Sequence, residues 1–210
     1  MTRLYHTFQV KDINVVKQQM LTWASRFNIC CFLDNQQYVS SYSSFECLLG
    51  VGSLSIFKPG TNFFNSLSSF IDFNNDWIFG HFNYEIKNKI ELPTVSKNTE
   101  ESAFPAYFLF VPEIVIILKG NEVKIGVIIH DAFLVYSQII KEVVAEPCHH
   151  VVAFTPIISR DEYLQRISKL KGHIHQGDCY EINFCQQFDA TIEINPVSVY
   201  SQLIKNSSNP

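Results

Sequence analysis

The residues with the clearest chemical pattern lie at 177–188, where the sequence reads GDCYEINFCQQF. If this segment is a strand, alternate side chains point to opposite faces, which places Glu181 and Asn183 on one face and Ile182 on the other. A carboxylate and an amide in a core need hydrogen-bonding partners, so such a face often lines a ligand site or a polar seam. The same alternation is typical of a strand with one face in water, so the residues alone leave both interpretations open.

Other groups of reactive side chains form weaker patterns. The CHH triplet at 148–150 has adjacent residues, which rarely converge on one ion, and a zinc site needs three or four ligands. We therefore expect no metal site in this chain. The HD pair at 130–131 should diverge on a strand, and His173 and His175 do not face one another on a helix. The sequence has neither a G-x-S-x-G nucleophile elbow nor a glycine-rich phosphate loop.

Composition and charge exclude several functional classes. With 47% hydrophobic and 17% charged residues, the chain of 210 residues has the composition of a folded domain. A net charge of −4 and the lack of a Lys/Arg cluster argue against nucleic-acid binding. The first residues have no apolar core, and the longest apolar runs are far shorter than the roughly 20 residues of a membrane span. We therefore expect no signal peptide, no membrane partner and a cytoplasmic protein with six reduced cysteines.

Helical spacing of apolar residues predicts helices at 13–27 and 159–176. The second begins with a Ser159–Glu162 capping box and ends at Gly177, which tolerates a left-handed cap. Asn195 followed by proline begins a third helix. Residues 63–73 fit either a helix or an irregular aromatic segment.

Apolar and alternating runs predict the strands. These are at 29–33, 42–51 and 179–185, with partial alternation at 76–85, a hairpin of strands 114–119 and 123–129, and a strand followed by a helix at 130–144. Gly120 and Asn121 form the hairpin turn. Together the patterns predict an α+β fold, with antiparallel sheets and helices packed outside them.

Five segments resemble the family of chorismate-utilising enzymes, in the family's order. Residues 177–183 resemble its G-D-x-[YF]-Q-x-N segment, although Glu181 stands in place of the glutamine. The other four are the LDN turn that ends at Asn35, YSSF at 42–45, the WIFGHFNYE segment at 77–85 and the segment 105–112 before the hairpin. Each match is short, but together they span nearly the whole chain in register.

Within that family the chain most resembles the branch of aminodeoxychorismate synthase component I, because Asn183 stands where the anthranilate branch tends to carry valine. The resemblance implies a two-sheet sandwich and a reaction of chorismate with ammonia that gives 4-amino-4-deoxychorismate for folate biosynthesis. It also implies magnesium as cofactor and a glutamine amidotransferase as partner.

The family's catalytic segments, a P-I-K-G-T lysine, the chorismate-binding residues and the magnesium-binding glutamates, do not occur in these 210 residues. We therefore expect an N-terminal portion without catalytic residues, with an N-terminal region at 1–150 and a truncated chorismate-binding region at 151–210.

The resemblance also implies a small pocket that holds tryptophan in some members of the family. The positions that correspond to it are Asn35, Tyr42, Ser43, Ser44, Phe45 and Pro210. Asp34 and Asn35 replace the glutamate and serine of the anthranilate synthases, and Ser44 replaces a frequent arginine. These positions are equally compatible with simple packing of a loop and a strand.

Two alternatives remain open from the sequence. The first is another enzyme of the family, anthranilate synthase component I or an isochorismate/salicylate synthase. In that case alanine would replace the lysine of the P-I-x-G-T segment in the anthranilate branch. The second is a non-enzymatic ligand-binding or assembly module.

Overall fold

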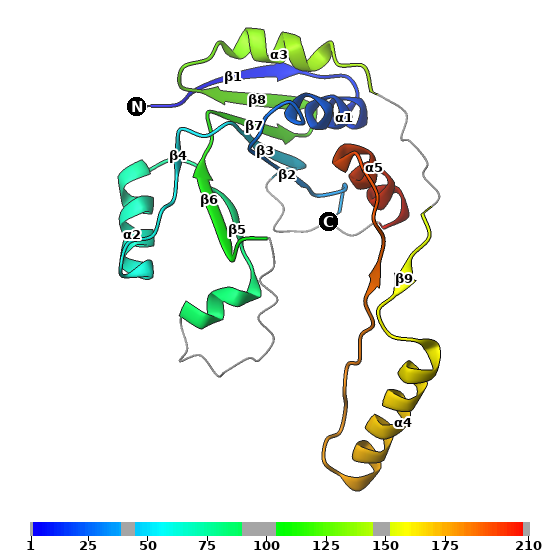
Figure 1. The fold of residues 1–210 in the computed structure, drawn as a ribbon. Helices are drawn as coiled ribbons and strands as arrows, with labels where there is room; N and C mark the ends of the chain where they lie inside the picture. Colours follow the sequence, from blue (N-terminus) through cyan, green and yellow to red (C-terminus); the bar gives the residue numbers. More distant parts are fainter. Residues whose placement is uncertain (1, 39–44, 90–103, 145–151, 208–210) are drawn as a thin grey trace. The chain divides into compact units, whose positions relative to one another are not determined.

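A computed structural model describes residues 2–38, 45–89, 104–144 and 152–207 of the chain (Figure 1). The chain forms two compact units. The first unit contains Met1–Ala145 and Tyr200–Pro210, and the second unit contains Glu146–Val199. The segments 39–44, 90–103, 145–151 and 208–210 lie outside the described residues, and with them the CHH triplet.

The first unit is built on a five-stranded antiparallel sheet in the order β1-β8-β7-β3-β2. Its strands are β1 Leu4–Gln9, β2 Cys30–Asp34, β3 Cys47–Val51, β7 Ile114–Lys119 and β8 Glu122–Val127. The β7–β8 hairpin confirms the predicted one, and Gly120 takes the left-handed conformation (φ +54°) that a tight turn requires. The predicted strand at 29–33 corresponds to β2. Of the strand predicted at 42–51, β3 confirms the part from Cys47 onward, and residues 42–44 lie outside the described residues.

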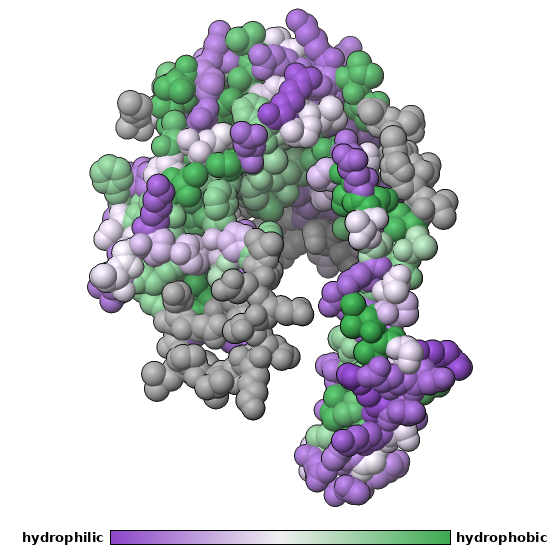
Figure 2. All heavy atoms as spheres, in the orientation of Figure 1, coloured by the Kyte–Doolittle hydropathy of each residue, from purple (hydrophilic) through white to green (hydrophobic). Residues whose placement is uncertain are grey.

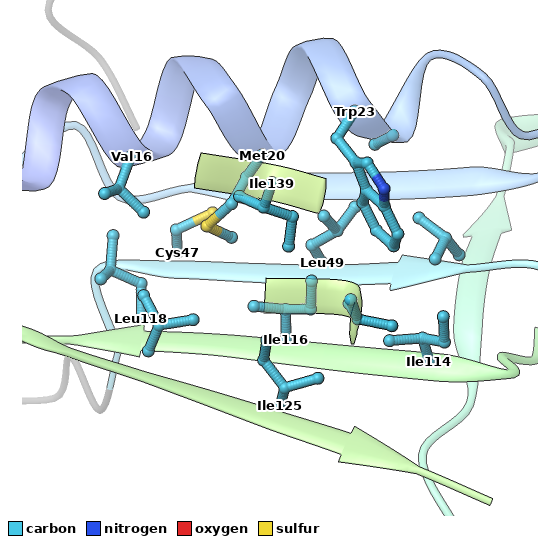
Figure 3. Close-up of a cluster of buried hydrophobic side chains, with 14 of the residues drawn as sticks. Val16, Met20, Trp23, Cys47, Leu49, Ile114, Ile116, Leu118, Ile125 and Ile139 are labelled. Atoms are coloured by element: carbon cyan, nitrogen blue, oxygen red, sulfur yellow. The ribbon is translucent and has the colours of Figure 1, made fainter. Parts of the chain in front are cut away.

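Two helices cover one face of this sheet, α1 Ile13–Ala24 and α3 Ala132–Ile140. Each begins at an aspartate, Asp12 or Asp131, whose carboxylate accepts hydrogen bonds from backbone N–H groups of the first turn. Alternate residues of the central strands face the helices and form the main core (Figure 3). Its most deeply buried members include Met20, Leu49, Ile116, Leu118, Ile125 and Ile139.

A second, three-stranded antiparallel sheet has the order β4-β6-β5, with β4 Ser55–Ile56, β5 Phe79–Phe82 and β6 Tyr107–Val111. It packs on the other face of the first sheet through Phe79 and Phe110, which meet Val115 in a smaller core. Gly50 permits this approach, because a Cβ at that position would lie 2.9 Å from the Phe79 ring. The expected α+β fold with antiparallel sheets is therefore confirmed.

Two further elements border the second sheet. Helix α2 Phe63–Asn74 begins after Asn62, whose side chain accepts a hydrogen bond from the Asn65 N–H, and it confirms the helical interpretation of 63–73. The Phe57 ring packs against Phe63 and Phe70 of α2. A 3₁₀ helix η1, Tyr84–Lys89, follows β5, so the alternation predicted to continue to residue 85 ends at Phe82.

The second unit contains α4 Arg160–Gln176 and a short antiparallel ladder of β9 Thr155–Pro156 with β10 Phe188–Asp189. Ser159 caps α4, and Gly177 ends it in the left-handed conformation (φ +83°), as predicted. Polar side chains gather over α4 (Figure 2). Helix α5 Pro196–Asn206 follows Asn195, whose side-chain oxygen accepts hydrogen bonds from the N–H groups of Val197 and Ser198; its residues from Tyr200 onward belong to the first unit.

Two strand predictions are wrong. Residues 179–185 are not paired in any sheet of the described structure; the pairing begins only at Phe188, because alternation alone does not supply a partner strand. The chain also does not continue as a strand after Val127. Residues 128–130 bend instead, and Asp131 begins α3.

Candidate functional site

The turn that follows β2 has an unusual backbone. The Tyr38 N–H donates to the Asn35 carbonyl (2.9 Å), and the Asn35 side-chain amide donates to the Tyr38 carbonyl (2.8 Å). Between them Gln36 and Gln37 have φ values of +53° and +55°, the left-handed region that favours glycine. Each such residue costs about 1 kcal/mol or more, so the surrounding structure must hold the turn in place.

Side chains from three other segments stabilise this turn. The Gln36 N–H donates to Asp34 Oδ1 (2.9 Å), and the Gln37 N–H donates to Glu46 Oε1 (3.0 Å). The Gln37 side-chain amide donates to Asn14 Oδ1 on α1 (2.8 Å). The turn is therefore fixed by both carboxylates and by the helix, as a preorganised binding loop would be.

Lys17 links these carboxylates. Its Nζ lies 2.8 Å from Asp34 Oδ1 and 2.7 Å from Glu46 Oε1, and all three side chains are largely buried. Burial alone would lower the pKa of Lys17, but the hydrogen bonds and charges of Asp34 and Glu46 outweigh it and raise that pKa above its ordinary value. This raised pKa favours the protonated form of Lys17, in which the amine cannot act as a nucleophile.

A cavity of about 160 Å³ opens beside the triad. It is lined by side chains of α1, β2, the turn and α5: Asn14, Lys17, Gln18, Leu21, Phe32, Asp34, Gln36, Gln37, Tyr200, Ser201 and Ile204. The rings of Phe32 and Tyr200 meet edge to face, with centroids 5.9 Å apart. Burial raises the pKa of the Tyr200 hydroxyl, and the nearby Asp34 carboxylate adds to the effect.

The cavity combines an aromatic wall with polar groups and the Lys17–Asp34 ion pair. Such a site suits a small molecule that has an apolar body and hydrogen-bonding groups. Among the described residues that line the cavity, no two side chains form a nucleophile–base pair.

The structure describes two of the six pocket residues expected from the sequence. Asn35 lies in the turn, and its N–H donates to the Glu46 carbonyl (2.9 Å). Phe45, the residue before Glu46, is 38% exposed, and its ring lies against Trp77 with centroids 6.2 Å apart. The remaining four lie outside the described residues: Tyr42, Ser43, Ser44 and Pro210.

The residues at this site that were not anticipated from the sequence include Lys17, Glu46 and Tyr200. They come from α1, the residue before β3, and α5, so no local spacing relates them. One sequence pattern could have revealed part of the site. Lys17 lies on the apolar side of the amphipathic helix α1, and a lysine buried there needs an acidic partner.

The GDCYEIN segment of the second unit has a different character. Glu181 and Asn183 are exposed, whereas the half-buried Phe184 ring packs on Tyr163 of α4 with centroids 5.3 Å apart. His173 Nδ1 and Asp178 Oδ2 lie 2.7 Å apart at the end of the helix. The segment therefore presents its polar side chains outward from the second unit.

Within the described residues, no three carboxylate, imidazole or thiol side chains group closely enough to hold a metal ion together. The described helices also include none with the length and apolarity needed to cross a membrane.

Comparison with known proteins adds two findings. The family model described as "chorismate binding enzyme" matches residues 56–210, which is most of the chain. Aminodeoxychorismate synthase component 1 of Klebsiella aerogenes is 32% identical over 53 residues, which cover 25% of this chain and 12% of that relative. The match thus covers a small part of the relative's length. The chain belongs to the chorismate binding enzyme family.

Proposed function

We propose that this chain is part of an aminodeoxychorismate synthase component I, which converts chorismate and ammonia to 4-amino-4-deoxychorismate for the synthesis of para-aminobenzoate and folate. The observation that carries the proposal is the 32% identity over 53 residues to a protein of that name, within a chain of the chorismate binding enzyme family. Asn183, in the GDCYEIN segment, favours the same branch over the anthranilate branch.

The proposed chemistry is a substitution on the chorismate ring. By the family resemblance, a lysine of a P-I-K-G-T segment displaces the ring hydroxyl, and ammonia then displaces the lysine. When bound, magnesium neutralises the substrate carboxylate. A glutamine amidotransferase would supply the ammonia, and the reaction would take place in the cytoplasm.

In this proposal the 210 residues supply the scaffold and no reacting group. The sequence holds neither the lysine segment nor the magnesium glutamates of the family. The first unit has a buried core and two packed sheets, which suit it to positioning other residues.

The test is an assay of the polypeptide encoded by the complete reading frame, with chorismate, ammonia and magnesium. The proposal predicts 4-amino-4-deoxychorismate as product, together with a lysine in the P-I-x-G-T segment. Formation of anthranilate, with alanine at that position, would instead assign the protein to the other branch. A stop codon directly after residue 210 would favour the non-enzymatic module.

We also propose that the cavity beside the β2 turn binds a small amino acid or aromatic amine in a structural or regulatory role. The supporting observation is its position, with Asn35 in the turn and Phe32 and Tyr200 in its wall. Calorimetric titration with tryptophan, in parallel with Ser43→Ala and Tyr200→Phe, tests this. Heat of binding that the variants reduce supports the pocket, and the absence of binding to the folded protein removes it.

A further inference from the structure

Strand β1 forms one edge of the five-stranded sheet, with β8 as its neighbour (Figure 1). Directly after the strand, the Val10 N–H donates to the Asn121 carbonyl on the β8 side (2.9 Å). In an antiparallel ladder the backbone groups of successive residues point alternately to the two sides of the strand. Counting back from Val10, the backbone groups of Phe8, His6 and Leu4 point to β8, and those of Gln9, Thr7 and Tyr5 point away from it. The Gln9 carbonyl already accepts a hydrogen bond from the Tyr136 hydroxyl of α3 (3.2 Å), so the open part of the edge is at Tyr5 and Thr7.

This edge lacks the features that usually protect edge strands. Natural proteins place lysine, other charges, proline or a bulge there to prevent pairing with another chain. The β1 sequence LYHTFQ has no acidic residue, no lysine or arginine and no proline, and its pairing with β8 runs without a bulge from Leu4 to Gln9. No described strand pairs with its outer side.

Helix α3 extends an apolar surface beside this edge. The Phe133 ring lies 5.2 Å from the His6 ring and 5.3 Å from the Phe8 ring, centroid to centroid. Phe133 is nevertheless 62% exposed, and Leu4 is 63% exposed. Open backbone groups therefore lie next to exposed apolar side chains, a combination that fits an added β-strand better than a globular partner.

We propose that the occupant of this edge is β1 of a second copy of the chain, paired antiparallel across a two-fold axis. The residues that point outward set the register, because Tyr5 of each copy must face Thr7 of the other for their backbone groups to bond. This register places Leu4 opposite Phe8, and it centres the axis on His6. A strand without Lys, Arg, Asp or Glu and with an apolar residue near each end is complementary to itself in this orientation, as an isologous interface requires.

The competing partner for an open strand is the opposite edge, β2. That strand ends in Asp34, which already binds Lys17, and its Phe32 side chain contacts Tyr200 of α5. β2 therefore ends in a charged residue, and its Phe32 ring is already packed against α5. β1 has no charged carboxylate of this kind, so β1 is the edge that can pair.

The experiment measures the mass of the 210-residue chain in solution by sedimentation over a range of concentrations. Thr7→Pro removes an N–H that points outward, so it should leave the β1–β8 ladder intact and remove two hydrogen bonds from the dimer. We expect a wild-type dimer, and a dissociation constant raised about tenfold or more in Thr7→Pro. Thr7→Val keeps the N–H and Leu33→Lys charges the opposite edge, so both should retain the dimer.

Hydrogen exchange on the wild-type chain gives an independent readout if Thr7→Pro does not fold. The Tyr5 and Thr7 amides should become protected as concentration rises. The Phe32 amide should not change; it points to the outer side of β2, because the Asn35 N–H three residues later points to β3. A wild-type chain that stays monomeric, a dimer unaffected by a folded Thr7→Pro, or a dimer lost only in Leu33→Lys would each overturn the proposal.

Discussion

The two units of the chain differ in how they are held together. The first unit has a core of fully buried side chains between a sheet and two helices, and a second sheet packs on the other face. The second unit has no buried residue among those described from 152 to 199, and a two-residue ladder is its only described strand pairing. Burial of apolar area is the main source of folding free energy, so the first unit should supply nearly all of the stability.

The part of the chain that should supply most of the stability is therefore not the part that carries the family's sequence signature. The segment that most clearly indicates the chorismate binding enzyme family, GDCYEIN, lies in the second unit, where its polar side chains are exposed. The buried triad of Lys17, Asp34 and Glu46 lies in the first unit. The family signature therefore does not depend on a large local core, and the two units should respond separately to substitution.

The largest expected effect comes from opening the main core. Met20 is fully buried, and Met20→Ala should lower the free energy of unfolding by about 2–5 kcal/mol, because a cavity adds to the lost transfer energy. The matched change Leu164→Ala on the half-exposed side of α4 should cost about 0.5 kcal/mol or less in the same measurement. Denaturant titration by tryptophan fluorescence reports the first unit, since Trp23 and Trp77 both lie there. Equal losses in the two variants would contradict the division between the units.

A somewhat smaller loss is expected when the triad is broken. Lys17→Met leaves Asp34 and Glu46 without their cation. Removing one partner of a fully buried pair costs roughly 3–5 kcal/mol, and the cost here should be somewhat lower because the side chains of Lys17 and Glu46 are 10% and 13% exposed. Asp34→Asn combined with Lys17→Met should recover part of that loss. A Lys17→Met protein as stable as the wild type would mean that the turn does not depend on the triad.

The triad also predicts a loss of stability at alkaline pH. The folded-state pKa of Lys17 lies above its ordinary value of 10.5, so its contribution is complete below that pH and is lost as the pH rises through the folded pKa. The raised pKa of Tyr200, ordinarily 10.0, acts in the same direction, because the unfolded chain releases that proton first. Unfolding titrations between neutral pH and pH 11 or so should show the decline, and Lys17→Met should decline less. A stability that rises in this range would contradict both assignments.

The smallest effect is expected at the cap of α4. Ser159→Ala removes the acceptor of the Glu162 N–H and should destabilise the helix by about 1 kcal/mol. Because the second unit has little core, this change should increase hydrogen exchange within α4 and leave the fluorescence transition of the first unit in place. Ser159→Asp is the matched control that keeps an acceptor. A shift of the global transition would show that the units unfold together.

Local signals in the sequence predicted most of the secondary structure. Ser159, Gly177 and the Asn195-Pro196 pair marked helix ends because caps act within one turn. Gly120 and Asn121 marked the hairpin because a tight turn, like a helix cap, depends on the residues within it. The strand expected at 179–185 failed because strand formation depends on a partner elsewhere in the chain, which alternation does not reveal.

The candidate site was harder to predict than the fold. Asn35 was expected from the family resemblance of the LDN turn, and its role in a pocket stays a prediction. Lys17, Glu46 and Tyr200 come from separate elements that only tertiary packing brings together. The position of β1 at the edge of the sheet could likewise not be predicted from the sequence, since the order of strands in a sheet is set by long-range pairing.

Chorismate turnover is the most direct test of the proposed function. The polypeptide of the complete reading frame and the 210-residue chain should be assayed side by side with chorismate, ammonia and magnesium. We expect 4-amino-4-deoxychorismate from the former and no turnover from the latter, because these 210 residues hold no lysine or magnesium segment of the family. Turnover by the 210-residue chain, lost on substitution of one of its own residues, or anthranilate as the product of the complete protein, would contradict the account.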